Sequence, residues 1–194
     1  MTTLRSAVLT IADLDEGFEI NGHAEPNSNI EMKYENGYKG LFARKDIIAG
    51  SVIFHLKGSI SRRANKYSVQ LGKDKHIDFP PIRKPNDDLD YAWQYVNHSC
   101  EPNGYVNAAE YSFCALRNIR KGEEITFNYL TTEHELATPF RCACGSAKCF
   151  GFIRGQKFLT ADEIAELLPV TSMTTSSIQP ALPPRPGKRL GETN

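Results

Sequence analysis

Residues 97–103 read Asn-His-Ser-Cys-Glu-Pro-Asn, so four side chains that could take part in chemistry stand side by side. The proline stiffens this segment and disfavours a helical conformation at Glu101. A shaped loop of this kind could hold a cysteine nucleophile, a metal ligand or a tight turn. The choice among these depends on which other parts of the chain meet the loop in space.

Three of the five cysteines are clustered, because Cys142, Cys144 and Cys149 form a C-x-C-x4-C pattern. Tetrahedral zinc needs a fourth ligand besides three thiolates. Cys100 is the best candidate, since Cys114 lies in Tyr-Ser-Phe-Cys-Ala-Leu and resembles a buried strand residue. The alternative is three unlinked, reduced cysteines in a surface turn. Disulfides are less expected, because the number of cysteines is odd and thiolate clusters persist in reducing, intracellular compartments.

Composition limits the class of protein. The 194 residues predict one domain with an extension, and 40% hydrophobic residues are enough to form a core. The 23 basic and 23 acidic residues balance, so no overall positive field favours direct binding to nucleic acid or to a membrane surface. We find no apolar run of membrane-spanning length and expect no secretory signal.

Hydrophobic patterning predicts a mainly β fold with few short helices. The segment 160–168 predicts a helix, because Thr160 and Glu163 form a capping box and Pro169 would end it. Segment 89–96, with Trp93, could be a short helix or a strand. Strands are expected within 4–20, 52–56, 67–71, 111–119 and 125–130, and a glycine-bearing turn over 37–43. Loops are expected over 21–29 and most of 72–90, and a disordered tail from 171 onward.

Four segments, in this order, resemble SET-domain protein-lysine N-methyltransferases that carry a post-SET zinc motif. They are Gly40-Leu41-Phe42-Ala43, the loop 97–103, Gly122-Glu123-Glu124-Ile125-Thr126-Phe127-Asn128-Tyr129, and the cysteine cluster followed by Gly151. The family commonly has Asp where this chain has Asn128. The resemblance covers about residues 30–155. It implies an N-terminal extension at 1–29, a SET domain at 30–131, a post-SET segment at 138–155, a helix at 156–169 and a tail at 170–194.

The resemblance also implies a SET-type fold of small curled sheets with a knot-like threaded segment. In that fold the loop 97–103 lies beside 122–129, where the methyl donor and the lysine meet. It further implies that Cys100 joins Cys142, Cys144 and Cys149 on one Zn²⁺ ion.

The family assigns roles to individual residues of this sequence. Tyr129 matches the catalytic tyrosine, Tyr67 a tyrosine that lines the lysine channel, and Phe127 a Phe/Tyr switch position at which Phe permits di- or trimethylation. The matching contacts for the cofactor S-adenosyl-L-methionine are Lys39, Gly40, Leu41, Asn97, His98, Tyr129 and Phe152, the last as a lid.

The activity implied is transfer of a methyl group from S-adenosyl-L-methionine to a lysine of a protein substrate, such as a histone tail. The sulfonium is already activated, so the protein must align the two reactants and let the lysine lose a proton. The alternatives are a catalytically weak zinc-binding interaction module and, more distantly, a cysteine hydrolase using Cys100 and His98. The sequence leaves the substrate, the oligomeric state and the compartment, nuclear or cytoplasmic, open.

Overall fold

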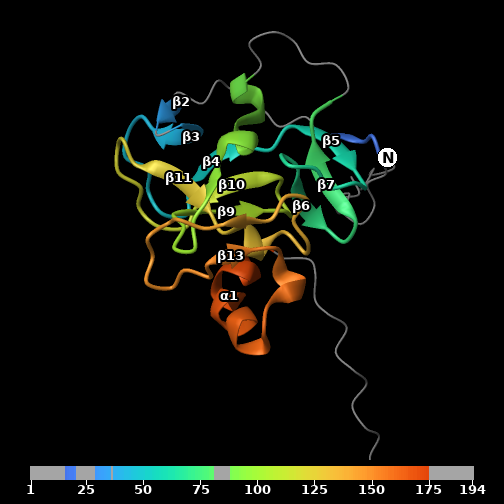
Figure 1. Ribbon diagram of the computed structural model, residues 1–194. Helices are drawn as coiled ribbons and strands as arrows, with labels where there is room; N and C mark the ends of the chain where they lie inside the picture. Colours follow the sequence, from blue (N-terminus) through green and yellow to red (C-terminus); the bar gives the residue numbers. More distant parts are fainter. Residues whose placement is uncertain (1–15, 21–28, 36, 81–87, 175–194) are drawn as a thin grey trace, which may run out of the picture.

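The computed structural model describes residues 16–20, 29–35, 37–80 and 88–174, with side chains up to Leu167 in the last helix. Four small β-sheets and short helices make up these parts of the chain (Figure 1). The mainly β fold of small sheets expected from the sequence is therefore confirmed. No helix in the described ranges is long and apolar enough to cross a membrane.

The first sheet has the order β2-β3-β11-β8 and brings together parts of three of the four motif segments. Its strands are β2 (Ile30–Glu35), β3 (Tyr38–Ala43), β8 (Asn97–His98) and β11 (Glu124–Phe127). β11 follows the two-residue period of a half-buried strand, because Ile125 and Phe127 are buried while the residues between them are less so. β8 pairs in parallel with β11, which places His98 opposite Phe127.

Two further sheets complete the body of the molecule (Figure 1). One has the order β4-β10-β9 and consists of β4 (Val52–His55), β9 (Gly104–Asn107) and β10 (Ser112–Ala115). The other has the order β1-β5-β7-β6 and consists of β1 (Glu19–Ile20), β5 (Gly58–Ser61), β6 (Val69–Gly72) and β7 (Lys75–Asp78). Their inward faces share one apolar core, in which the ring of Phe113 stacks on Phe54 at 5.0 Å and meets Phe127 edge-on at 5.9 Å.

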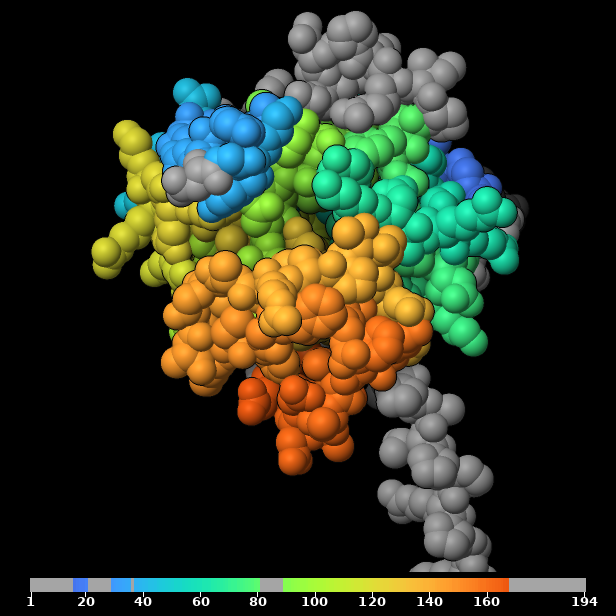
Figure 2. Space-filling view, in the orientation of Figure 1, coloured from blue at the N-terminus to red at the C-terminus, as the bar shows by residue number. Residues whose placement is uncertain are grey.

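The chain after β11 forms a second, smaller core against the first sheet. It contains η3 (Tyr129–Thr131), the strand pair β12 (Phe140–Arg141) and β13 (Phe152–Ile153), η4 (Gln156–Phe158) and α1 (Ala161–Thr174). Leu130, Ile153 and Leu167 are buried together there, next to Cys100. Figure 2 shows this C-terminal part, in orange, packed along one side of the body.

Several local expectations are corrected by the structure. The expected turn over 37–43 is instead the strand β3, which pairs with β2 along its whole length. Among the described residues of 72–90, which exclude 81–87, Lys75–Asp78 forms β7 and Asp88 begins the 3-10 helix η2 (Asp88–Tyr95), so this part is not mostly loop. β7 lies between β5 and β6, so pairing on both sides offsets its weak sequence pattern. The strand expected over 125–130 ends at Phe127, because the Asn128 side chain accepts a hydrogen bond from Leu130 N and caps η3.

The C-terminal helix begins as expected and ends later. Thr160 and Glu163 exchange the reciprocal hydrogen bonds of a capping box. Pro169 does not end the helix, which continues to Thr174, so the first residues of the expected tail are helical. A proline removes one amide donor, and the turns on either side can keep their own bonds. The rest of the tail, and the expected loop over most of 21–29, lie outside the described residues.

Candidate active site

Asn97 joins three strands at one end of the first sheet. Its side-chain nitrogen donates to Lys39 O at 3.0 Å and to Glu124 Oε1 at 2.7 Å. Gly40 leaves room beside this contact, because a Cβ there would lie 2.7 Å from Glu124 Oε1 and 3.2 Å from Asn97 Nδ2, so that these side chains would have to shift. The backbone of β3 therefore comes close to the polar groups of β8 and β11.

His98 has an open backbone edge and a fully engaged side chain. The neighbouring Ser99 N donates to Phe127 O, and alternate residues bond in a parallel ladder, so the amide and carbonyl of His98 point away from β11. β8 is the last strand of its sheet, which leaves that edge without a strand partner. These two groups are thus available to a ligand in the adjoining cavity.

The His98 imidazole links the sheet to the cysteine cluster. Its Nδ1 accepts a hydrogen bond from Tyr129 N at 3.1 Å, and its Nε2 lies 3.3 Å from Cys100 Sγ. Burial lowers the pKa of His98 to about 4, so the ring is neutral at physiological pH. Because Nδ1 is an acceptor, the single ring proton is on Nε2 and is directed at the sulfur.

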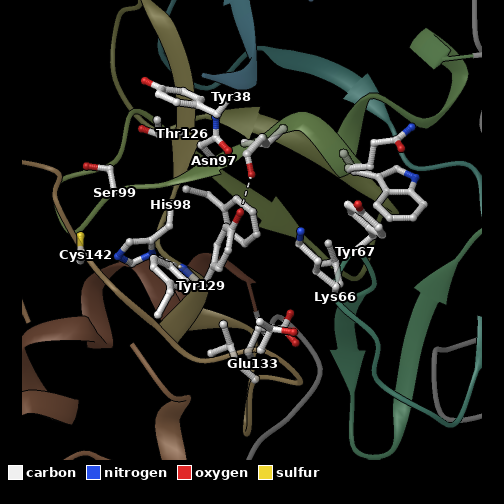
Figure 3. A pocket seen from close by; sticks show the side chains of 18 of the residues that line it. Tyr38, Lys66, Tyr67, Asn97, His98, Ser99, Thr126, Tyr129, Glu133 and Cys142 are labelled. Carbon is white, nitrogen blue, oxygen red and sulfur yellow. Dashed lines mark hydrogen bonds between the residues drawn. The ribbon is translucent and has the colours of Figure 1, made fainter. Parts of the chain in front are cut away.

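Tyr129 stands in the wall of the cavity with its hydroxyl anchored (Figure 3). The hydroxyl donates to Val96 O at 2.9 Å, and the ring packs against Phe127 at 4.7 Å and Phe140 at 5.9 Å. Burial raises the pKa of Tyr129, and the negative charges of Glu133 and Glu124 raise it further. The phenol therefore stays protonated, and its oxygen is left with lone pairs that can accept a hydrogen bond.

A cavity of about 680 Å³ connects these groups. The residues expected at the site divide into two sets. Those that line the cavity are Tyr67, Asn97, His98, Phe127, Tyr129, Cys142 and Cys144. Those that do not line it are Lys39, Gly40, Leu41, Phe152, Cys100 and Cys149. Leu41 is fully buried in the core, and Phe152 is 48% exposed on β13. Phe140 of β12, which was not expected at the site, lines the cavity instead.

The sulfur atoms of Cys100, Cys142, Cys144 and Cys149 all lie within 4.8 Å of one another. Cys100 Sγ is 3.9 Å from Cys142 Sγ and 4.0 Å from Cys149 Sγ. A tetrahedral zinc ion with Zn–S bonds of about 2.3 Å separates its sulfurs by about 3.8 Å, so the donor set fits this metal. Cys114 is buried elsewhere, beside Ser112.

Backbone amides already point at these sulfurs. Phe150 N lies 3.4 Å from Cys100 Sγ. Gly151 N lies 3.4 Å from Cys149 Sγ, and Cys144 N lies 3.4 Å from Cys142 Sγ. Amide donors favour thiolate over thiol because they stabilise the negative charge. Burial raises the pKa of the Cys100 thiol, so a bound cation is what would hold this sulfur as thiolate.

Sequence reasoning missed three residues that shape the site. Asn103 is buried and acts as an extra strand partner for β11, because its amide accepts from Thr126 N at 2.9 Å and donates to Glu124 O at 2.7 Å. Tyr38 and Glu133 both line the cavity. The final Asn of the 97–103 motif was a visible signal for Asn103, whereas Glu133 has no local pattern around it.

Known proteins resemble this chain most clearly over the region that carries the site. The family described as SET domain matches residues 37–130. Those residues form a SET domain. The match includes β3, β8 and β11, and it ends one residue after Tyr129.

Curated relatives extend the similarity beyond the SET domain. A histone-lysine N-methyltransferase, H3 lysine-36 specific, of Saccharomyces cerevisiae is 32% identical over 148 residues, which cover 69% of this chain and 19% of that protein. Its namesake in Eremothecium gossypii is 29% identical over 162 residues, covering 76% and 23%. The chain thus spans less than a quarter of the length of these relatives. Methyltransferase flvH of Aspergillus flavus is 34% identical over 73 residues, covering 37% and 41%.

Solved structures are similar to part of this chain as well. A crystal structure of KRYPTONITE in complex with mCHH DNA, H3(1-15) peptide and SAH gives a TM-score of 0.48 at 23% identity, covering 64% of this chain and 29% of that chain.

Proposed function

We propose that this protein transfers a methyl group from S-adenosyl-L-methionine to the side chain of a lysine in a protein substrate. The observation that carries the proposal is the Tyr129 hydroxyl, which is anchored on Val96 O in the wall of a cavity beside the open edge of β8. The match of residues 37–130 to the SET domain, a range that includes Tyr129 and β8, supports this proposal.

The cofactor would bind at the end of the first sheet. The two backbone groups of His98 suit the adenine, which presents donors and acceptors along its edge, and Asn97 suits the methionine part. Lys39, Gly40 and Leu41 would contribute backbone close to the ligand, since Gly40 has no side chain between β3 and the Asn97–Glu124 pair. When bound, the cofactor supplies an electrophilic methyl group on a sulfonium.

The lysine would enter past Tyr67, which is half exposed and belongs to the turn before β6. Its nitrogen would meet the Tyr129 oxygen, whose own O–H donates to Val96 O and which can therefore accept a hydrogen bond from the amine. Fixing the amine in this way aligns its lone pair with the methyl group, and alignment is the main contribution that the protein must make. The buried ring of Phe127 and the partly buried ring of Tyr129 make the environment apolar, which favours the neutral amine.

The zinc ion proposed for the four cysteines is structural, because all four tetrahedral positions are taken by protein sulfurs. Thiolate ligands of this kind suit a reducing, intracellular environment. The names of the relatives make a histone the first substrate to test. We propose no direct contact with nucleic acid or membrane, because the balanced net charge offers no field for either.

The test measures cofactor binding and methyl transfer separately. Calorimetry would follow S-adenosyl-L-methionine binding, and transfer of a labelled methyl group would be followed on core histones, nucleosomes and whole-cell lysate. We expect Tyr129→Phe to lower turnover at least about 100-fold, as for loss of one well-placed polar group in an active site, with zinc content unchanged.

Two outcomes would contradict the proposal. Full activity of Tyr129→Phe would remove the tyrosine from the reaction. A zinc-loaded protein that binds no cofactor would instead be an interaction module. A cysteine hydrolase would require a free Cys100 thiolate, whereas this sulfur faces three other cysteines.

A further inference from the structure

Glu133 is a buried acidic residue in the wall of the cavity. The roles proposed above, orientation of the lysine amine and binding of the cofactor, do not use it. Glu133 is 6% exposed and lines the cavity; it lies six residues after Phe127, the last residue of β11 (Figure 3). Its own amide donates to Tyr129 O at 2.8 Å, so its position is tied to the residue that would receive the lysine. An ionisable group buried at such a place needs a physical explanation.

Only one of the two carboxylate oxygens is engaged. Oε1 accepts from Gln70 N at 2.8 Å and from Thr132 Oγ1 at 3.1 Å, which holds the group between β6 and η3. Within the described parts of the chain, Oε2 has no hydrogen-bond partner. It is also not among the fully enclosed polar atoms without a partner, and Glu133 lines the cavity, so we infer that Oε2 is open to the cavity space. The carboxylate is therefore fixed by one oxygen and offers the other to a ligand.

The electrostatic surroundings tune this acid for proton transfer. Burial raises the pKa of Glu133 to about 7, against the opposing effect of the bonds from Gln70 and Thr132. An acid or base works best when its pKa lies near the working pH. The charge of Glu133 also raises the pKa of Tyr129, so its field reaches the phenol at which the lysine nitrogen would sit.

Other titratable groups face the same cavity, and none neutralises Glu133. The Lys66 ammonium lies over the Tyr67 ring, 5.4 Å from its centre, and forms no ion pair with Glu133 within 4.0 Å. Glu124 is bound to Asn97. The ionisable residues lining the cavity besides Glu133 are Tyr38, Lys66, Tyr67, His98, Glu124, Tyr129, Cys142 and Cys144.

We propose that Glu133 is the proton acceptor for the substrate lysine, an inference that rests on the proposed methyltransferase function. One N–H bond of the lysine ammonium breaks and an O–H bond forms at Oε2, giving a neutral amine and a neutral acid. The amine lone pair then forms the new N–C bond as the S–C bond of the cofactor breaks. The products are a methylammonium and the neutral thioether S-adenosylhomocysteine, and Glu133 afterwards releases its proton to solvent.

The physical advantage of this arrangement is the removal of charge from a poorly hydrated space. An ammonium cannot attack, and in water its pKa of about 10.4 keeps nearly all of it protonated at neutral pH. A carboxylate and an ammonium transferred into an apolar cavity lose hydration, so proton transfer between them becomes favourable. The cationic sulfonium nearby disfavours the ammonium further.

The experiment compares pH profiles of turnover on core histones at saturating cofactor. Glu133→Gln keeps an oxygen for Gln70 N and Thr132 but cannot take a proton. We expect about a 100-fold lower kcat at pH 7, the lower end of the usual range for general-base catalysis, with cofactor binding unchanged. The deficit should shrink toward pH 10, where an appreciable fraction of solution lysine, with its pKa of about 10.4, is itself deprotonated. Glu135→Gln is the matched control, because that carboxylate is exposed and pairs with Lys157 outside the cavity.

A second variant separates chemistry from structure. In Glu133→Ala the space of the lost carboxylate should admit formate, and added formate should restore part of the rate. A Glu133→Gln deficit that is the same at every pH, together with no rescue of Glu133→Ala by formate, would overturn the inference and leave a structural role. A wild-type protein that methylates nothing would overturn the proposed function itself, whereas an active wild type with an equally active Glu133→Gln would overturn only this inference.

Discussion

Single atoms decide what Tyr129 can contribute. Its hydroxyl proton is committed to Val96 O, so toward the cavity the oxygen can only accept. Its raised pKa makes the phenolate rare at neutral pH, which rules it out as the base that deprotonates lysine. The orienting and the proton-accepting roles are therefore assigned to two residues four positions apart, Tyr129 and Glu133.

Phe127 governs how much room remains beside that oxygen. It is buried, lines the cavity and contacts the Tyr129 ring. We expect Phe127→Tyr to shift the product toward monomethyl-lysine, because an added hydroxyl fills space and binds a water where a second methyl group would turn. Mass spectrometry of exhaustive reactions measures the distribution. Phe152→Tyr, on the exposed face of β13, is the control and should leave the distribution unchanged.

The same measurement tests the interpretation of Phe127 itself. A wild-type product that stops at monomethyl-lysine would contradict the expectation that Phe at this position permits di- or trimethylation. An unchanged distribution in Phe127→Tyr would show that the cavity wall does not limit the number of methyl groups.

At the scale of elements, a glycine in one strand makes room for a ring of the neighbouring strand in the same sheet. Gly104 on β9 faces Phe113 of β10, and a Cβ there would lie 2.4 Å from Phe113 Cε1. We expect Gly104→Ala to destabilise the fold by roughly 1–3 kcal/mol, because a fully buried ring cannot move aside without strain. For a chain of this size, that corresponds to a fall in melting temperature of about 2–12 °C in scanning calorimetry.

A double variant checks the cause of that loss. Phe113→Leu shortens the side chain that Gly104→Ala would meet, so the two changes together should cost less than the sum of their separate effects. Additive costs would mean that the loss arises elsewhere, for instance in the backbone of β9.

The elements also show which parts of the fold can be predicted from sequence. β4, β6, β10, β11 and the start of α1 were expected, because an apolar run, apolar alternation or a capping box lies within each segment, whereas β3 was expected as a turn. β8 is two residues long and exists through its pairing with β11. β7 is polar and exists between two neighbours. Such elements depend on partners far along the chain, which local patterns do not contain.

The same limit applies to the site. Its motif residues Asn97, His98 and Tyr129 were identified through their local context, and the structure brings them together at one cavity. Glu133 is fixed by Gln70, which lies 63 residues earlier in the chain, so its burial could not be predicted from its neighbours in sequence. The cluster of Cys100 with the later cysteines was accessible because ligand counting works without knowledge of the fold.

At the scale of the whole molecule, the four cysteines attach the C-terminal part to the SET domain. Cys100 belongs to the loop after β8, whereas its three partners lie between β12 and β13. Cys142 and Cys144 line the cavity, and His98 contacts both Cys100 and Tyr129. Zinc at this cluster would therefore order a wall of the cavity as well as the tail.

Replacing Cys100 tests this connection. We expect Cys100→Ser to lower zinc affinity by more than the 10–100-fold typical of losing an outer-shell partner, because a ligand itself is lost. Hydrogen exchange should then rise over 142–153, and cofactor binding and turnover should fall together, since one wall of the cavity loses its anchor. Cys114→Ser is the control, because that buried thiol contacts Ser112 and lies outside the cluster. A Cys100→Ser protein that keeps one tightly bound zinc and normal protection over 142–153 would show that zinc binding does not depend on the 97–103 loop. That result would contradict the proposed connection between the zinc cluster and the cavity.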